Sequence, residues 1–164
     1  MQKKIAYGGI CTSLCVLLTL CSVYFPTGKA ALLFVASFLI YVLCLRTDKR
    51  TALICYGASS ILIFFITSSS SPLIAVSFVL CFGNYPILKC IVEGLKKSIA
   101  WMVKALLYSI YFFAVYFSVK SLFSVNIPYG VGVLYFIGMA MFLFYDVLLQ
   151  HTGKYTLVRF FKSF

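Results

Sequence analysis

Acidic residues are scarce in this chain, which has three of them against fourteen lysines and arginines in 164 residues. The three are Asp48, Glu93 and Asp146. A relay of carboxylates, or a pair of catalytic acids, needs more members placed together than this sequence supplies. Proton relays and paired-carboxylate catalysis are therefore excluded. Asp146 is expected to neutralise a basic residue of a neighbouring helix or of the carboxyl-terminal tail.

Other signatures of chemistry are also missing. The sequence holds one histidine, His151, and no Cys-x-x-Cys pair. It has no glycine-rich phosphate loop, no histidine pair of the zinc-protease type and no glycine-flanked nucleophilic serine. We therefore expect no enzymatic activity, no nucleotide hydrolysis, no metal centre and no cofactor.

Charge of either sign is sparse, at 10% of the residues, whereas hydrophobic residues make up 63%. A soluble domain of this composition would lack a solvated surface. Uncharged runs close to the roughly 20 residues that cross a bilayer recur along the chain. The sequence predicts an all-α membrane protein, a single six-helix transmembrane domain over residues 1–164. The expected spans are residues 5–25, 30–45, 51–67, 73–88, 105–123 and 131–149.

Turn-forming residues separate these spans. Pro26 to Gly28 follow the first span, and the serine run from Ser68 to Ser71 follows the third. The fourth span contains Asn84 and Pro86, and proline removes a backbone donor. We expect a kink or an early end there.

Positive charge gathers on alternate loops, as the orientation rule for membrane helices requires. With the amino terminus inside, twelve of the fourteen cations face the cytoplasm and only Lys29 and Lys120 lie outside. Both termini are then cytoplasmic, an N-in/C-in topology. The net charge of +11 is interpreted as a signal of orientation and as an attraction to anionic lipid; no nucleic-acid partner is expected.

Residues 89–104, between the fourth and fifth spans, combine apolar residues at helical spacing with charged residues on other faces. The pattern predicts an amphipathic helix at the cytoplasmic surface. The tail from His151 to Phe164 interleaves basic and aromatic residues, a mixture suited to lipid headgroups.

Seven cysteines lie within the spans or at their edges. We interpret them as small, weakly polar packing residues. Cys11 and Cys15 are one helical turn apart, but no histidine lies near them in the first span, so a metal site is disfavoured.

Small residues spaced by a helical turn mark the first span. Ala6, Gly9 and Ser13 lie near its cytoplasmic end. Such residues allow the backbone of a second helix to approach closely. The pattern is typical both of packing within one chain and of docking to a partner.

Polar and aromatic residues gather at the outer ends of the spans. If the outer loops converge, these residues form a cup of hydrogen-bonding groups with aromatic walls, typical of small-molecule sites. The alternative is an interfacial aromatic belt with ordinary polar loops. Two outer cations would favour a ligand carrying a carboxylate or phosphate. The candidate substrate-binding residues are Lys29, Tyr116, Lys120, Asn126, Tyr129 and Tyr135.

The segment from Lys3 to Leu14, followed by a span that ends in Phe25 and Pro26, resembles the start of the substrate-binding S components of energy-coupling factor (ECF) vitamin transporters. Length, helix count and cytoplasmic termini are also similar. In that family the first helix docks on a transmembrane coupling subunit through an Ala-x-x-x-Ala-type motif, where this chain has glycine and serine. The resemblance implies partner-docking roles for Gly9 and Ser13, and ligand contacts for the six candidate residues.

The resemblance implies a substrate-capturing integral membrane subunit of a micronutrient uptake transporter. Its energy would come from a separate coupling subunit and ATPases, and it would lie in a bacterial plasma membrane. The alternative is a non-transport scaffold, similar in layout to small rod-shape membrane proteins, that recruits partners through residues 89–104 and the basic tail.

Overall fold

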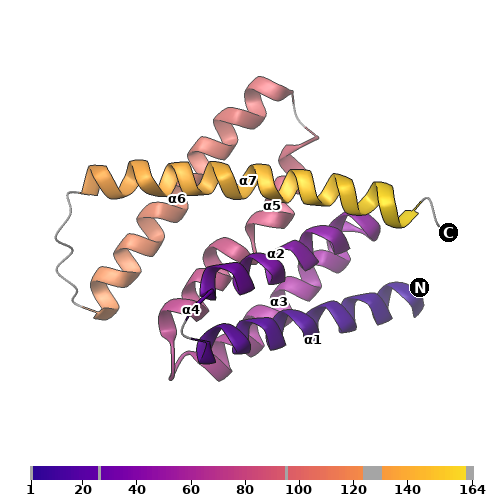
Figure 1. Ribbon diagram of the computed structural model, residues 1–164, viewed down its shortest axis with the longest axis horizontal. Helices are drawn as coiled ribbons and strands as arrows, with labels where there is room; N and C mark the ends of the chain where they lie inside the picture. Colours follow the sequence, from indigo (N-terminus) through magenta and orange to yellow (C-terminus); the bar gives the residue numbers. More distant parts are fainter. Residues whose placement is uncertain (1, 26, 95, 124–130, 162–164) are drawn as a thin grey trace. The chain divides into compact units, whose positions relative to one another are not determined.

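The computed structural model describes residues 2–25, 27–94, 96–123 and 131–161 (Figure 1). These residues form helices and short turns, without a β-strand among them. The elements are α1 (Gln2–Tyr24), α2 (Lys29–Arg46), α3 (Lys49–Thr67), α4 (Pro72–Ser77), the π-helical turn η1 (Phe78–Phe82), α5 (Tyr85–Val92), α6 (Lys97–Phe123) and α7 (Val131–Phe161).

Six helical segments are long and apolar enough to cross a membrane, which confirms the number predicted from the sequence. Such a set is compatible with a multi-pass membrane protein. The membrane concerned and the side on which each loop lies remain predictions. The six segments are Ile5–Tyr24, Lys29–Arg46, Lys49–Thr67, Pro72–Val92, Ser98–Ser118 and Val131–Gly153.

Several serine and threonine side chains inside these segments donate to the backbone of their own helices. In α1, Thr19 donates to the carbonyl oxygen of Cys15 at 2.8 Å, and Ser22 donates to that of Thr19 at 2.7 Å. The hydrocarbon core of a bilayer offers no water to such hydroxyl groups. A backbone acceptor within the same helix satisfies them, so they are tolerated in an apolar span.

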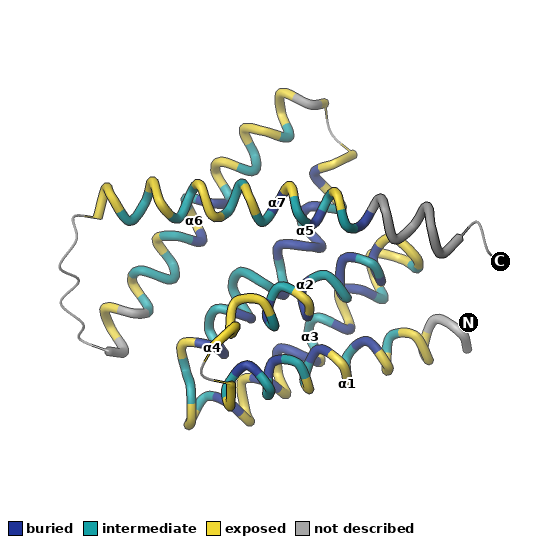
Figure 2. Tube along the Cα trace, in the orientation of Figure 1, coloured by how far each residue is buried: buried dark blue, intermediate teal, exposed yellow. Residues whose placement is uncertain are grey.

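The chain divides into two compact units, residues 1–104 and residues 105–164. In the first unit α1 packs against α2 and α3, and α2 also packs against α5. The core is built from small and branched side chains, as close helix packing requires. Its most buried members include Cys15, Ala36, Ile40, Ile63 and Phe78, each with no exposed area (Figure 2).

The turn between α1 and α2 depends on Gly28. This residue has a φ of 80°, in the left-handed region that side chains with a Cβ atom disfavour. Lys29 then begins α2, and Leu32 donates its N–H to the carbonyl oxygen of Gly28 at 3.1 Å. The turn-forming sequence after the first span therefore reverses the chain as predicted.

The fourth segment is broken where the sequence predicted a kink. A turn at Gly83 and Asn84 separates η1 from α5, and Pro86 lies in the first turn of α5. Proline has no N–H to donate to the carbonyl four residues earlier, so a continuous α-helix is interrupted here. The N–H of Gly83 instead bonds to the carbonyl oxygen of Phe78, five residues back, at 2.7 Å.

The amphipathic helix predicted for residues 89–104 is not a single element, so that boundary was wrong. Its first residues complete α5, which ends at Val92, and residues 97–104 form the first two turns of α6. Gly94 lies in the turn between them, where its N–H bonds to the carbonyl oxygen of Ile91 at 3.3 Å. Glycine commonly ends helices, and it does so here despite apolar periodicity on both sides.

The second unit consists of the rest of α6 and of α7. The last span was predicted over residues 131–149, and the candidate span in the structure is Val131–Gly153, within a helix α7 that continues to Phe161 and has 31 residues. At 1.5 Å per residue it is about 46 Å long, against a hydrocarbon core of about 30 Å. Part of α7 must therefore extend beyond the apolar layer. Most described side chains of α6 and α7 are exposed or half-buried (Figure 2).

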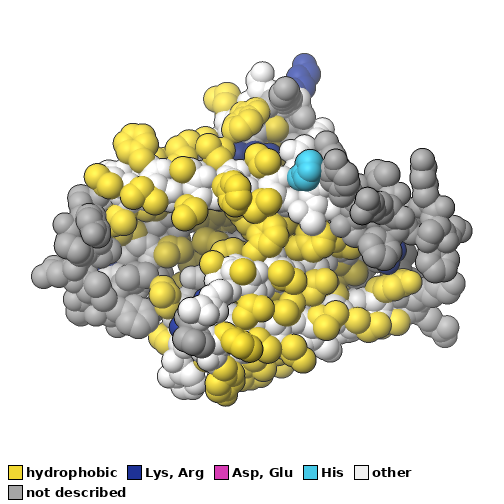
Figure 3. Space-filling view, in the orientation of Figure 1, with side chains coloured by type: hydrophobic (Ala, Val, Ile, Leu, Met, Phe, Trp, Pro, Cys, Tyr) yellow, Lys and Arg dark blue, Asp and Glu magenta, His cyan; other side chains and the backbone are white. Residues whose placement is uncertain are grey.

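Apolar side chains cover most of the described surface on the face shown in Figure 3. Large exposed side chains include Ile54, Phe65, Phe117 and Phe136, each more than 70% exposed. In water such a surface would be unstable, whereas in a bilayer it is the surface that lipid chains contact.

Candidate functional site

Two faces of α1 differ in their surroundings. Cys11, Cys15 and Thr19 are buried against the rest of the first unit. Ala6, Gly9 and Ser13 are exposed. At about 100° per residue these three lie on the opposite side of the helix from the buried face. The structure therefore keeps the small-residue face of α1 apart from the internal packing.

Gly9 marks this exposed face most clearly. A Cβ atom on Gly9 would have no described atom within 4 Å, whereas one on the adjacent Gly8 would lie 3.5 Å from Cγ2 of Thr51. Ser13 donates to the carbonyl oxygen of Gly9 at 3.0 Å, so its hydroxyl is satisfied within α1. At these three positions the face carries small side chains, and the Ser13 hydroxyl needs no outside partner, a combination that suits a helix–helix contact in a membrane.

Two of the predicted substrate-binding residues contact a common ring in the second unit. Phe112 stacks on Tyr116 with centroids 6.2 Å apart, and meets Tyr135 edge-on at 5.1 Å. The Tyr135 hydroxyl also shares a 2.8 Å hydrogen bond with Ser109. The two tyrosines thus belong to one cluster between α6 and α7.

Tyr108 anchors this aromatic cluster to the backbone. Its hydroxyl donates to the carbonyl oxygen of Tyr135 at 2.6 Å, and its ring lies 5.2 Å from that of Tyr135 and 5.3 Å from that of Phe142. Tyr108 was not singled out from the sequence. The signal that could have identified it is Gly138, a glycine one turn after Tyr135 that leaves room for the phenol.

The remaining predicted ligand residues are less fully described. Lys29 and Lys120 are exposed, at the start of α2 and near the end of α6. Lys29 belongs to the first unit and Lys120 to the second. Asn126 and Tyr129 lie outside the described residues. The structure therefore brings together Tyr116 and Tyr135, and leaves the predicted cup as a whole untested.

A polar cluster with a buried lysine and a buried tyrosine joins α2 to α5, and the sequence analysis missed it because it assigned both charges to a cytoplasmic surface segment. The Lys89 side chain has no exposed area, and its Nζ lies 3.6 Å from a carboxylate oxygen of Glu93. Tyr41 donates to the other carboxylate oxygen at 3.1 Å. Lys89 Nζ also lies 5.9 Å from the centroid of the Tyr41 ring. We call these three residues the polar clasp.

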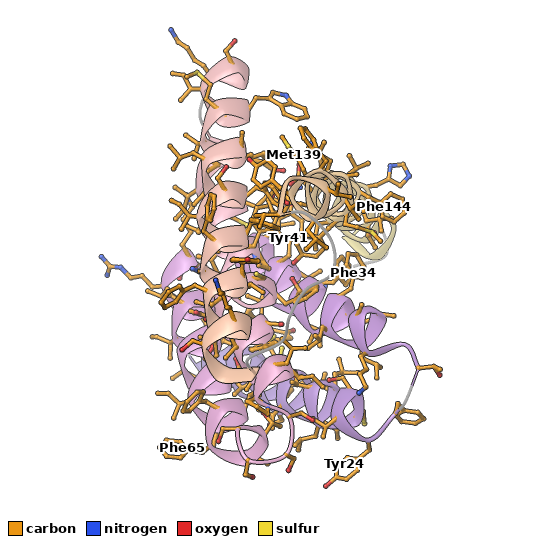
Figure 4. The ribbon with its side chains drawn as sticks, turned by 90° about the vertical axis from the view of Figure 1, so that its left-hand side faces the viewer. Tyr24, Phe34, Tyr41, Phe65, Met139 and Phe144 are labelled. Atoms are coloured by element: carbon orange, nitrogen blue, oxygen red, sulfur yellow. The ribbon has the colours of Figure 1, made fainter. Side chains whose placement is uncertain are left out.

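The polar clasp satisfies a charge that would otherwise be costly to bury. An ammonium within an apolar span needs a counter-charge or hydrogen-bond acceptors. Glu93, which directly follows α5, supplies the charge one turn after Lys89, and the Lys89 ammonium lies over the Tyr41 ring, whose face is negative. Figure 4 shows Tyr24, at the end of α1, pointing away from the helices. Tyr41 is buried, in contrast to Tyr24 at the end of α1, which is 83% exposed. The clasp therefore fixes a specific contact between α2 and α5.

The cysteines of the first unit lie mainly in its core. Cys11, Cys15, Cys44 and Cys55 are buried, and all seven cysteines are free thiols. Thr12 donates to the sulfur of Cys55 at 3.2 Å, and the Cys15 thiol donates to the carbonyl oxygen of Ala36 at 3.4 Å. Within the described part of the chain, no three histidine, cysteine or acidic side chains are placed to hold a metal ion.

No protein-family model matches this chain, and comparisons with curated proteins and with solved structures gave no significant match.

Proposed function

We propose that this chain is the substrate-capturing membrane subunit of a micronutrient uptake transporter of the ECF type, in a bacterial plasma membrane. A transmembrane coupling subunit and its ATPases would supply the energy. The observation that carries the proposal is the division of α1, which buries its cysteine face and exposes the face formed by Ala6, Gly9 and Ser13.

The exposed face of α1 favours a helix as its partner. Lipid chains contact a helix surface of any shape, but a flat surface of small residues gains most from a second backbone at close range. Open space beside Gly9 and the internally bonded Ser13 hydroxyl leave that approach unobstructed. These features support docking of a coupling subunit on α1.

The aromatic cluster between α6 and α7 supports a role in binding a small molecule. It combines aromatic walls with the hydroxyl groups of Ser109 and Tyr135, a composition typical of ligand sites. Lys120, exposed near the end of α6 in the same unit, favours an anionic ligand, and Lys29, in the first unit, stays a separate candidate. Basic loops on the predicted cytoplasmic side would bind anionic lipid.

Docking is tested by purifying the tagged chain from its native membranes in mild detergent and measuring ATP hydrolysis in the purified fraction. Ala6→Leu and Gly9→Leu place bulk on the proposed contact. Ala58→Leu, at an exposed position of α3, makes the same change as Ala6→Leu on another helix. We expect the wild type and Ala58→Leu to carry ATPase activity, and the two α1 variants to lose it. Equal activity in all four, or activity in none, would refute the proposal.

A scaffold is the second candidate function, and one observation favours it. Ile99, Trp101 and Met102 are about half or more exposed on the first turns of α6, next to Lys104, whose Nζ lies 6.0 Å from the Trp101 ring. Apolar and basic groups on one surface suit a protein partner or an interfacial contact. Trp101→Ala should abolish partner capture by a scaffold, while leaving an ATPase contact through α1 intact.

A further inference from the structure

The contact between α2 and α5 brings a particular face of each helix together. Tyr41 of α2 is contacted by Lys89 of α5 and by Glu93, which directly follows α5. Cys44 follows Tyr41 by one helical turn, and Cys90 directly follows Lys89 in α5. The contact between α2 and α5 therefore brings one cysteine of each helix into the same part of the first unit, where Cys90 packs against the core cluster that contains Cys44.

The two thiols lie close enough to influence each other's ionisation. Cys44 is buried in the core cluster and Cys90 packs against that cluster while half-buried. Lys49, the first residue of α3, is close enough to act electrostatically on both sulfur atoms. Cys90 is the more exposed of the two, so a small oxidant has access to the pair from its side.

This pair differs from the other thiols of the described chain. Cys11, Cys15 and Cys55 are also near neighbours, but all three are buried in the core. Cys81 is half-buried, as Cys90 is, but burial alone acts on its thiol. Cys44 and Cys90 thus combine a neighbouring thiol with partial access at one of the two sulfur atoms.

A disulfide between Cys44 and Cys90 would hold α5 against α2, because α5 is a short helix between two turns. Turns bound α5 on both sides, at Gly83 and Asn84 before it and at Glu93 and Gly94 after it. An eight-residue helix between two turns is positioned largely by its side-chain contacts. The polar clasp supplies non-covalent contacts with α2, and a sulfur–sulfur bond beside the clasp would make the connection covalent.

We propose that Cys44 and Cys90 are a redox modification site, at which a hydroperoxide oxidises the two thiols to a disulfide that joins α5 to α2. The thiolate of one cysteine attacks the peroxide, the O–O bond breaks, and a sulfenic acid forms with release of water or an alcohol. The thiolate of the other cysteine then attacks that sulfur, the S–S bond forms, and the sulfenic hydroxyl leaves as water. Two electrons pass from the thiols to the peroxide, and a small thiol reverses the reaction by exchange.

The experiment uses the full chain in lipid nanodiscs, treated with hydrogen peroxide, blocked with a thiol reagent and mapped by mass spectrometry without reduction. We expect the Cys44–Cys90 cross-link to be the main disulfide and to disappear after dithiothreitol. Free Cys44 and Cys90 thiols, or cross-links spread evenly over the seven cysteines, would overturn the proposal. This readout does not involve substrate or ATPases, so it stands apart from the proposed function.

A rotated thiol provides the matched control. Replacing Cys90→Ser together with Ile91→Cys keeps one thiol on α5 but turns it by about 100°. Ile91 is 46% exposed, so the new thiol is accessible to peroxide. We expect the cross-link to Cys44 to form at least about tenfold more slowly, because disulfide geometry tolerates little displacement. Cross-linking as fast as in the wild type would show that α2 and α5 are not held in the described contact, and would overturn the proposal.

Discussion

Gly138 of α7 and Tyr108 of α6 approach so closely that a Cβ atom on Gly138 would lie 2.6 Å from the Tyr108 hydroxyl oxygen. Only a glycine at this position lets the phenol reach the carbonyl oxygen of Tyr135, one turn earlier in α7. The contact between α6 and α7 therefore depends on the absence of a side chain at Gly138 as well as on the Tyr108 phenol.

Substituting Gly138→Ala should lower the free energy of unfolding by about 1–3 kcal/mol, because the phenol must move from its bonded position. SDS titration of the chain in mixed micelles, followed by circular dichroism, measures this change. Gly132→Ala, at an open position of the same helix, is the control and should be neutral or slightly stabilising. Equal losses in the two variants would contradict the described contact.

Removing the Tyr41 hydroxyl should weaken the polar clasp. Tyr41→Phe keeps the ring beside Lys89 but loses the hydrogen bond to Glu93, so unfolding should become easier by about 1 kcal/mol. Tyr24→Phe, at an exposed ring, serves as the reference and should change nothing. The same SDS titration distinguishes them; a Tyr41→Phe variant as stable as the Tyr24→Phe variant would argue against the clasp.

Because Lys89 pairs with Glu93, substitutions at the two positions should have non-additive effects on the free energy of unfolding. Lys89→Met removes a fully buried side chain and leaves the Glu93 carboxylate without its nearest cation, whereas Lys89→Met with Glu93→Gln removes both charges. A double-mutant cycle should give a coupling energy of about 1–2 kcal/mol, with the double variant less impaired than the sum of the single ones. Strict additivity would mean that the two charges act independently.

The break in the fourth segment depends on another close approach. A Cβ atom on Gly83 would lie 2.7 Å from the ring of Tyr56, whose hydroxyl donates to the carbonyl oxygen of Val79 at 2.8 Å. Gly83→Ala should therefore displace Tyr56 and cost about 1–3 kcal/mol of stability. Gly57→Ala is the control: Gly57 follows Tyr56 in the sequence, and a Cβ atom there would have no described atom within 4 Å. An undisturbed Gly83→Ala variant would mean that Tyr56 does not pack into the break.

Local sequence pattern predicted much of the fold. Apolar runs located the six segments, and Pro86 located the break in the fourth, because both effects act within a few residues. Span ends were less accurate: the last span was predicted to end at residue 149, whereas the candidate span ends at Gly153. The helix α7 continues to Phe161, and basic and aromatic residues are compatible with a helix that extends past the apolar layer. Gly94 divided a segment whose apolar periodicity predicted a single helix.

Side-chain contacts between segments far apart in the sequence could not be predicted from local sequence pattern. Tyr41 and Glu93 are 52 residues apart, and nothing local to either marks the pairing. Lys89 and Glu93 were interpreted as surface charges because isolated charges at span edges usually face water. The small residues of α1 were identified correctly as a pattern, but only the structure distinguishes the face that is packed internally from the face that is exposed.

Capture of a small molecule is the central claim, and native mass spectrometry of the detergent-purified chain tests it most directly. The account predicts one small anionic molecule per chain, lost in Tyr135→Phe, Lys120→Ala and Asn126→Ala and retained in Tyr24→Phe. A chain that is reproducibly empty, or one whose bound molecule is unaffected by all of these substitutions, would contradict it.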